Sequence, residues 1–103
     1  MSKYERTIIG DFNEILSFCE TSILKKSVSA SLTDETNFES NGIRVAIRVF
    51  ERYSLFGKDL VSLCVSLIGE SDKLLLTAIS SGAWTDSFLE KFMETFEIQY
   101  PNQ

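Results

Sequence analysis

Three arginines that recur at every fourth position are the residues of this chain best suited to chemistry. They are Arg44, Arg48 and Arg52, in the run Ile-Arg-Val-Ala-Ile-Arg-Val-Phe-Glu-Arg at residues 43–52. A guanidinium group binds phosphate or carboxylate through two parallel hydrogen bonds. Successive side chains of a strand point to opposite faces, so the three arginines share one face of a predicted strand. Residues four positions apart in a strand are separated by about 14 Å, which suits an extended anion or the acidic strip of a partner.

The two faces of this predicted strand differ in composition. One face is aliphatic and is expected to be core; it carries Ile43, Val45, Ile47 and Val49. The other face carries the arginines together with Ala46 and Phe50, and we expect it to be the uncovered face of a sheet. Serines of the two neighbouring strands would flank the arginines there: Ser29, Ser31, Ser62 and Ser66. The sequence thus predicts a basic surface on which hydroxyl groups add short hydrogen bonds.

Three interpretations of this arginine face remain open. The first is a solvated surface, because an uncovered face is polar and cross-strand carboxylates can neutralise arginines whose stems cover apolar neighbours. The second is contact with another protein chain, through the open face or through a free strand edge. The third is a binding site for an extended anionic ligand. Of the two functional interpretations, we favour self-association or protein interaction.

Self-association has support of its own in the sequence. Phe50 shares the arginine face, and Leu55 and Phe56 lie at a predicted hairpin tip, where a turn does not require apolar residues. Residues 4–9 form a predicted strand without proline, a residue that would block pairing with the edge of another strand. We therefore expect a homodimer. An acidic protein or an anionic ligand is the other kind of partner that the arginine face would accept.

Catalysis has little support, because the chain contains no histidine. That absence removes Ser-His and Cys-His nucleophilic pairs and the commonest metal ligand. The sequence also lacks a phosphate-binding loop, a dinucleotide fingerprint and a calcium loop. No spacing pairs Glu51 with Glu70 as an acid and a base. We expect a non-enzymatic domain that uses no metal and no cofactor.

Length and composition indicate one globular domain over residues 1–103, with 44% hydrophobic and 24% charged residues. The formal net charge of -5 argues against nucleic-acid binding, which relies on neutralising phosphates. The start of the sequence lacks the apolar run of a signal peptide. The longest apolar stretch, residues 60–68, is interrupted by serines and is too short to span a bilayer. We expect a cytoplasmic protein that makes no membrane contact.

The two cysteines are expected to be free thiols. Cys19 falls on the apolar stripe of a predicted helix, whereas Cys64 alternates with the serines of a predicted strand and faces away from the core. Their spacing is not that of a paired metal or redox motif, and disulfides are rare in a reducing compartment.

The first third of the chain predicts a strand followed by a helix. Residues 4–9 form the strand, and Asp11 caps the helix, with Glu14 three positions later as in a capping box. Apolar residues follow at helical spacing: Phe12, Ile15, Leu16, Cys19 and Ile23. Lys25 and Lys26 end the helix, where its dipole favours cations.

The remainder predicts four strands and a second helix. The strands are residues 27–33, 43–52, 60–68 and 74–80, with a polar loop over 34–42 that turns at Asn41-Gly42. Thr85 is the predicted cap of the last helix, which has a broad apolar face: Phe88, Leu89, Phe92, Met93 and Phe96. The order β-α-β-β-β-β-α predicts an α+β fold, with one five-stranded antiparallel sheet and two helices packed on one face.

This element order resembles the half-domain of TATA-box-binding proteins (a TBP-like arrangement). The resemblance implies that the first strand lies at a sheet edge, beside the fifth. Four short stretches also resemble a small bacterial family of unknown function: residues 27–32, 42–44, 49–54 and 78–82. That second likeness implies a bacterial origin and brings no activity with it.

Overall fold

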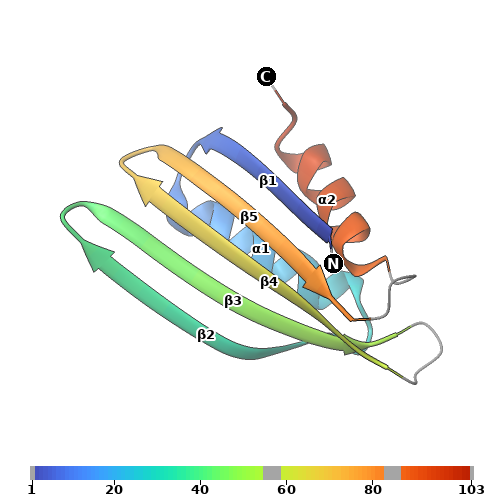
Figure 1. Ribbon diagram of the computed structural model, residues 1–103. Coiled ribbons are helices and arrows are strands. Elements are labelled where there is room, and N and C mark those ends of the chain that lie inside the picture. The colour runs from blue at the N-terminus through green and yellow to red at the C-terminus, as the bar shows by residue number, and fades with distance from the viewer. Residues whose placement is uncertain (1, 55–58, 83–86, 103) are drawn as a thin grey trace.

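The computed structural model describes residues 2–54, 59–82 and 87–102, and its elements follow the predicted order (Figure 1). The elements are β1 (Ser2–Ile9), α1 (Phe12–Lys26), β2 (Ser31–Ser40), β3 (Ile43–Tyr53), β4 (Leu60–Glu70), β5 (Lys73–Ser81) and α2 (Phe88–Gln99). The α+β class is therefore confirmed. The predicted apolar hairpin tip at Leu55 and Phe56 and the predicted helix cap at Thr85 lie outside the described residues.

The five strands form one antiparallel sheet in the order β1-β5-β4-β3-β2. β1 lies at one edge beside β5, and β2 forms the other edge. Both helices lie on the far side of the sheet in Figure 1, so the face turned toward the viewer is the one on which neither of them packs. Among the described helices, none is long and apolar enough to cross a bilayer.

The helices begin and end much as the sequence indicates. The side chain of Asp11 accepts a hydrogen bond of 2.8 Å from the backbone N–H of Glu14, which satisfies a donor at the start of α1. Lys25 and Lys26 occupy its last turn. The predicted stripes face the sheet: Phe12, Ile15, Cys19 and Ile23 of α1 and Phe88, Leu89, Phe92 and Phe96 of α2 are buried.

The core lies between these helices and alternate residues of the three central strands. Its fully buried strand residues include Phe50, Leu63, Leu67, Leu76 and Ala78. Gly69 allows α1 to approach closely, because a Cβ at this position would lie 2.8 Å from Phe12 Cδ2 and 2.7 Å from Leu74 Cδ2. The second position that requires glycine is Gly42, whose φ of 82° follows a φ of 52° at Asn41 in the predicted turn.

The predicted position of β2 was wrong. The strand covers Ser31–Ser40, and the residues expected to form a polar loop pair with β3 as far as Ser40. Every residue of β2 is exposed, because it is an edge strand that the helices do not reach. A strand with two polar faces lacks the alternation by which strands are recognised. A register shift between Leu32 and Asp34 interrupts its pairing with β3.

Candidate functional site

The arginines lie on the helix side of the sheet, so the prediction that they line its uncovered face was wrong. Directly paired residues of an antiparallel ladder share a face, and Arg48 pairs with the core residue Val65 while Arg52 pairs with Val61. Both arginines are only 6% exposed. Phe50, placed on the same outward face by the sequence, is completely buried.

Each of the three arginines donates a hydrogen bond to a side chain of α1 or of its C-cap residue. Arg44 Nη2 donates to Asn13 Oδ1 at 2.9 Å, Arg48 Nε to Glu20 Oε2 at 2.6 Å, and Arg52 Nη1 to Ser27 Oγ at 3.2 Å, where Ser27 caps the end of the helix. The partners on the helix recur every seven residues. Seven residues advance a helix by about 10.5 Å and two turns, while four residues advance a strand by about 13 Å. The two periods match closely enough for one helix face to meet all three arginines.

Aromatic rings stack on the guanidinium groups of Arg44 and Arg52. The guanidinium carbon of Arg44 lies 4.1 Å from the ring centroid of Phe12, and that of Arg52 lies 4.6 Å from the centroid of Phe88. Such cation–π contacts are favourable, more so when they are desolvated.

The fourth arginine of the chain, Arg6, follows the same pattern on β1. Its guanidinium carbon lies 5.5 Å from the ring centroid of Phe96, and its Nη1 donates to the carbonyl of Tyr100. Nearby, the hydroxyl of Tyr4 donates to Glu97 at 2.8 Å. These contacts join the first strand to the last helix, so all four arginines connect the sheet to the helical layer.

Arg48 is the most extensively bonded of the four. Besides Glu20, it has Glu35 Oε2 of β2 at 3.4 Å from Nε. Its Nη1 donates to the carbonyls of Thr36 at 3.1 Å and Ile47 at 3.0 Å, and its Nη2 to Asn37 Oδ1 at 2.9 Å. Every nitrogen of the guanidinium group is therefore hydrogen-bonded within the protein, which gives Arg48 a structural role.

The arginine side of β3 was wrongly predicted to be uncovered because both faces of this strand contain apolar residues. β3 lies next to the exposed edge strand, where the helices no longer cover the sheet fully, and long arginine stems extend from it to α1 while covering core atoms. Ala46 and Phe50, between the arginines, were the signal that this face is core. Glu20, seven residues from both Asn13 and Ser27, was a second signal on the helix.

The predicted site residues are divided between the two sides of the sheet. Ser62 and Ser66 lie on the uncovered face, opposite Glu51 and Ile47 of β3, and Ser31 lies there too. Ser29 precedes β2 and accepts a hydrogen bond of 3.1 Å from the backbone N–H of Tyr53. Arg44, Arg48 and Arg52 point to the other side, so the structure does not bring the predicted arginine and serine groups together.

The uncovered face is apolar at its centre instead of basic. The register places ten aliphatic or Phe residues on it: Ile9, Phe38, Ile43, Val45, Ile47, Val49, Leu60, Ile68, Leu75 and Ile79. Phe38 is 64% exposed and Ile68 is 38% exposed. Cys64, Ser66 and Thr77 lie among them, as predicted for the first two. We call this set of residues the open apolar face.

The charged residues of the open apolar face lie around its border. Lys3 and Glu5 lie on the edge strand β1, and Asp34 lies on the edge strand β2. Glu70 and Lys73 flank the hairpin between β4 and β5, and Glu51 lies near the other end of the sheet, opposite Ser62. Within the described central strands, no charged residue occurs on this face over 45–49, 64–68 or 75–79. A contiguous apolar patch with a polar border is typical of an interaction site.

A family model described as a family of unknown function, DUF6054, matches residues 1–98 of the chain. The chain belongs to the DUF6054 family. The prediction of a family of unknown function is thereby confirmed, and its bacterial origin stays a prediction. No curated protein and no solved structure matches the chain.

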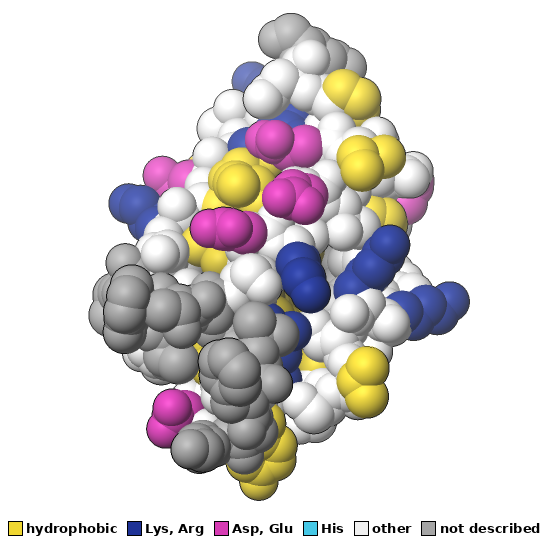
Figure 2. Space-filling model, turned by 90° about the vertical axis from the view of Figure 1, so that its right-hand side faces the viewer, with side chains coloured by type: hydrophobic (Ala, Val, Ile, Leu, Met, Phe, Trp, Pro, Cys, Tyr) yellow, Lys and Arg dark blue, Asp and Glu magenta, His cyan; other side chains and the backbone are white. Residues whose placement is uncertain are grey.

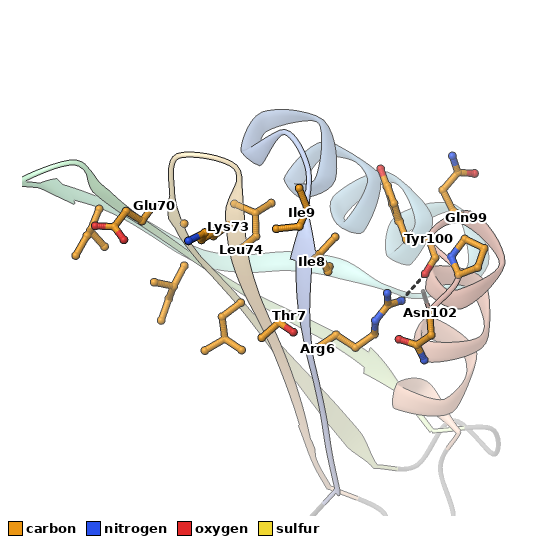
Figure 3. Close-up of a pocket in the computed structure, with 15 residues that line it drawn as sticks. Arg6, Thr7, Ile8, Ile9, Glu70, Lys73, Leu74, Gln99, Tyr100 and Asn102 are labelled. Carbon is orange, nitrogen blue, oxygen red and sulfur yellow. Dashed lines mark hydrogen bonds between the residues drawn. The ribbon is translucent and has the colours of Figure 1, made fainter.

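A hollow of about 850 Å³ lies at the end of the DUF6054 sheet, around β1 (Figure 3). Its lining comes from both faces of the sheet, with Ile8 on the helix side and Ile9 on the open apolar face. Figure 3 shows Arg6 directed toward Tyr100, while Lys73 lies on the other side of β1. The hollow therefore extends around the edge strand β1 from one face of the sheet to the other, and it is not an enclosed cavity.

Both cysteines of this DUF6054 chain are free thiols. Burial, with a smaller effect of the neighbouring Glu20 carboxylate, raises the pKa of Cys19 to about 12. Burial also raises the pKa of Cys64. A nucleophilic cysteine needs a lowered pKa, so neither thiol has the environment of a reactive centre.

The exterior on the α2 side differs from the open apolar face. Figure 2 looks onto that side and shows acidic side chains and basic side chains in two neighbouring groups, with hydrophobic side chains scattered between them. Such a surface of mixed charge is typical of one that faces water. The open apolar face differs from this surface, because the charges of its described residues lie only at its border.

Proposed function

We propose that this protein is a non-catalytic, self-associating domain in which two copies pack through their open apolar faces. The observation that carries the proposal is the composition of that face. Its centre consists of aliphatic residues with Cys64, Ser66 and Thr77, and its charges lie at the border. Exposed apolar surface of this kind is unfavourable in water and is stabilised by burial against another apolar surface.

The distribution of charge on this face is that of a protein interface. The centres of such interfaces are depleted of charged residues, and their borders are polar. Here Phe38, Ile68 and Ile79 remain substantially exposed in a single chain. The helix side of the same sheet is already filled by α1 and α2, so the open apolar face is the side that a partner can cover.

The size of the face is sufficient for a stable contact. Five strands about 4.8 Å apart and about nine residues long give a face of roughly 24 by 30 Å, or about 700 Å². Stable interfaces bury about 800 Å² per partner. Two twisted sheets pack face to face at about 10 Å, as in a β-sandwich.

A second copy is the occupant that the border charges favour. Both signs are present there: two lysines, Lys3 and Lys73, and four carboxylates, Glu5, Asp34, Glu51 and Glu70. A border of mixed sign can be complementary to itself, which a symmetric dimer requires. A partner whose charges are all of one sign would be repelled by the border groups of the same sign.

The alternative function, binding of an extended anion by Arg44, Arg48 and Arg52, receives less support. Arg48 and Arg52 are buried, and Arg48 is engaged by Glu20 and the backbone of β2. Pairing of two chains through the β1 edge is the other arrangement that the sequence suggested. That arrangement would leave the open apolar face exposed in the dimer.

Sedimentation at a series of concentrations tests the proposal. The wild-type protein is expected to be a dimer, and Ile68→Lys is expected to be a monomer, because the lysine places a charge at the centre of the buried face. The matched control is Ile98→Lys on α2, where the isoleucine is 82% exposed and away from the sheet. This control should remain dimeric. A wild-type monomer at every concentration would overturn the proposal, as would a dimer of unchanged affinity for Ile68→Lys.

A further inference from the structure

One row of the open apolar face crosses all five strands and has opposite charges at its two ends. The register pairs its members in sequence across the sheet: Lys3, Ile79, Cys64, Val49 and Asp34. Lys3 lies on the edge strand β1 and Asp34 on the edge strand β2. Cys64 lies on β4, the central strand, and therefore at the middle of the row.

Two such rows are complementary when one is turned over onto the other. A two-fold axis that runs parallel to β4 and between the two sheets exchanges the edges and keeps each row at its own height. β1 of one copy then lies over β2 of the other. Within this row, Lys3 faces Asp34, Ile79 faces Val49, and Cys64 faces Cys64 of the second copy.

The second row along the sheet from this one, beyond the row that contains Glu5 and Ser66, is complementary under the same operation. It consists of Thr7, Leu75, Ile68, Val45 and Phe38. Leu75 then faces Val45, Ile68 faces its own copy on the axis, and the exposed ring of Phe38 covers Thr7. In these two rows apolar side chains thus meet apolar side chains, Cys64 and Thr7 aside, and the only charges meet in pairs of opposite sign. In the row between them Ser66 faces its own copy and Glu5 faces Thr36. In the row beside the hairpin between β4 and β5, Glu70 faces its own copy at the border of the interface.

A two-fold axis perpendicular to the strands in the plane of the interface gives a poorer match. It places each strand over itself in the reverse direction. When it is centred on Ser66, Glu5 faces Glu5, and Asp34 faces the ring of Phe38. This axis forms no pair of opposite charges, whereas the strand-parallel axis forms two Lys3–Asp34 pairs, and it places a carboxylate against an apolar ring, which is unfavourable.

The geometry points to a dimer whose two-fold axis runs parallel to the strands close to Cys64, with Lys3 of each copy paired with Asp34 of the other. This arrangement rests on the face-to-face dimer proposed above and specifies its partner surface. A lysine side chain is long enough to cross most of the gap of about 10 Å between packed sheets. Two such ion pairs lie at the border of the interface, where they set the orientation of the two chains.

Charge exchange tests this arrangement through the dissociation constant of the dimer. Lys3→Glu alone and Asp34→Lys alone should each weaken the dimer by roughly tenfold at low salt, because each creates two like-charged pairs. The double variant K3E/D34K should restore the wild-type constant to within about threefold. As a control, Lys91→Glu on the exposed surface of α2 should change the constant little. Absence of restoration in the double variant would overturn the arrangement.

Cross-linking provides a second measurement that does not depend on affinity. Lys3→Cys and Asp34→Cys are combined in one chain that also carries Cys64→Ser. The two new thiols lie on opposite edges of one sheet, about 19 Å apart, so a bis-maleimide with a span of about 10 Å cannot join them within a chain. Across the gap of about 10 Å between packed sheets they are too far apart for a disulfide but within reach of this reagent. The reagent should yield a covalent dimer, whereas with Lys3→Cys and Cys64→Ser alone it should not. A protein that is not cross-linked although it sediments as a dimer would contradict the strand-parallel axis.

The outcomes separate the two proposals. If Ile68→Lys leaves the dimer intact, the open apolar face is not the interface and both proposals fail. If Ile68→Lys abolishes the dimer while neither the exchanged charges nor the cross-linking behaves as expected, the face is correct and the axis is wrong.

Discussion

Arg48 Nε lies 2.6 Å from Glu20 Oε2, and this ion pair joins the strand β3 to the helix α1. The arginine side chain is 7% exposed and that of the glutamate 31% exposed. A buried guanidinium group is tolerated only with hydrogen-bonding partners. Thr36 and Asn37 of β2 and the carbonyl of Ile47 in β3 supply the others. One polar cluster thus connects three elements at the border of the core.

Removal of the carboxylate should therefore destabilise the fold. Glu20→Ala leaves Arg48 with a weaker set of partners, and we expect the free energy of unfolding to fall by about 1–3 kcal/mol. Denaturant unfolding measures this change. The control is Glu94→Ala on an exposed position of α2, which should stay within about 0.5 kcal/mol of wild type. Equal stability of the two variants would show that the ion pair is dispensable.

Stability should fall at alkaline pH because of Cys19. The pKa of its thiol is raised from 9.0 to about 12 in the folded protein, so the folded state binds the proton more tightly than the unfolded state. Its contribution is therefore complete below about pH 9 and is lost as the pH rises toward 12. Cys19→Ala loses packing and is less stable at every pH. In this variant the free energy of unfolding should lack the decrease that the wild type shows between pH 9 and about pH 12. If the free energy of unfolding of the wild type and of the variant changed equally with pH above pH 9, the decrease could not be due to the Cys19 thiol.

The two thiols should differ in their accessibility to a thiol reagent. In the native protein Cys64 should react and Cys19, which is 1% exposed, should not; both should react in denaturant. If two chains cover Cys64 as proposed, its rate of modification should rise on dilution below the dissociation constant. A rate independent of concentration would count against that coverage.

A methyl group at position 69 should disturb the contact between β4 and α1. Gly69→Ala places a Cβ less than 3 Å from side-chain atoms of Phe12 and Leu74, and such overpacking costs about 1–3 kcal/mol. Thermal or denaturant unfolding shows the loss. Phe12→Leu in the same chain should recover part of it, because the smaller side chain vacates the space. Additive losses in the double variant would indicate that the clash is not the cause.

Features with one clear physical signal could be predicted from the sequence. The cap at Asp11 and the stripe through Cys19 follow directly from residue types and helical spacing, and the outward direction of Cys64 follows from its alternation with valine and leucine. The sheet order agrees with the pattern of short connections between successive strands.

The candidate site was not predictable in the same way. In β3 every second residue is aliphatic, and the other face carries Phe50 and Ala46 beside the arginines, so alternation alone does not identify the core face. Which face of β3 is buried depends on residues distant in sequence, because Glu20 and Phe88 provide the environment that an arginine needs in the interior. The exposed strand β2 was missed because neither of its faces is apolar.

The arginines of β3 recur every four residues and their partners along α1 recur every seven, so the lengths of both segments are constrained. Insertion of one residue between Asn13 and Glu20 would turn the rest of α1 by about 100° and move two of the three partners away from Arg48 and Arg52. One residue inserted in β3 would send the following arginine to the opposite face. In DUF6054 chains with this architecture, insertions and deletions should therefore be confined to the connections, and alignments of these two segments should be free of gaps even where the side chains vary.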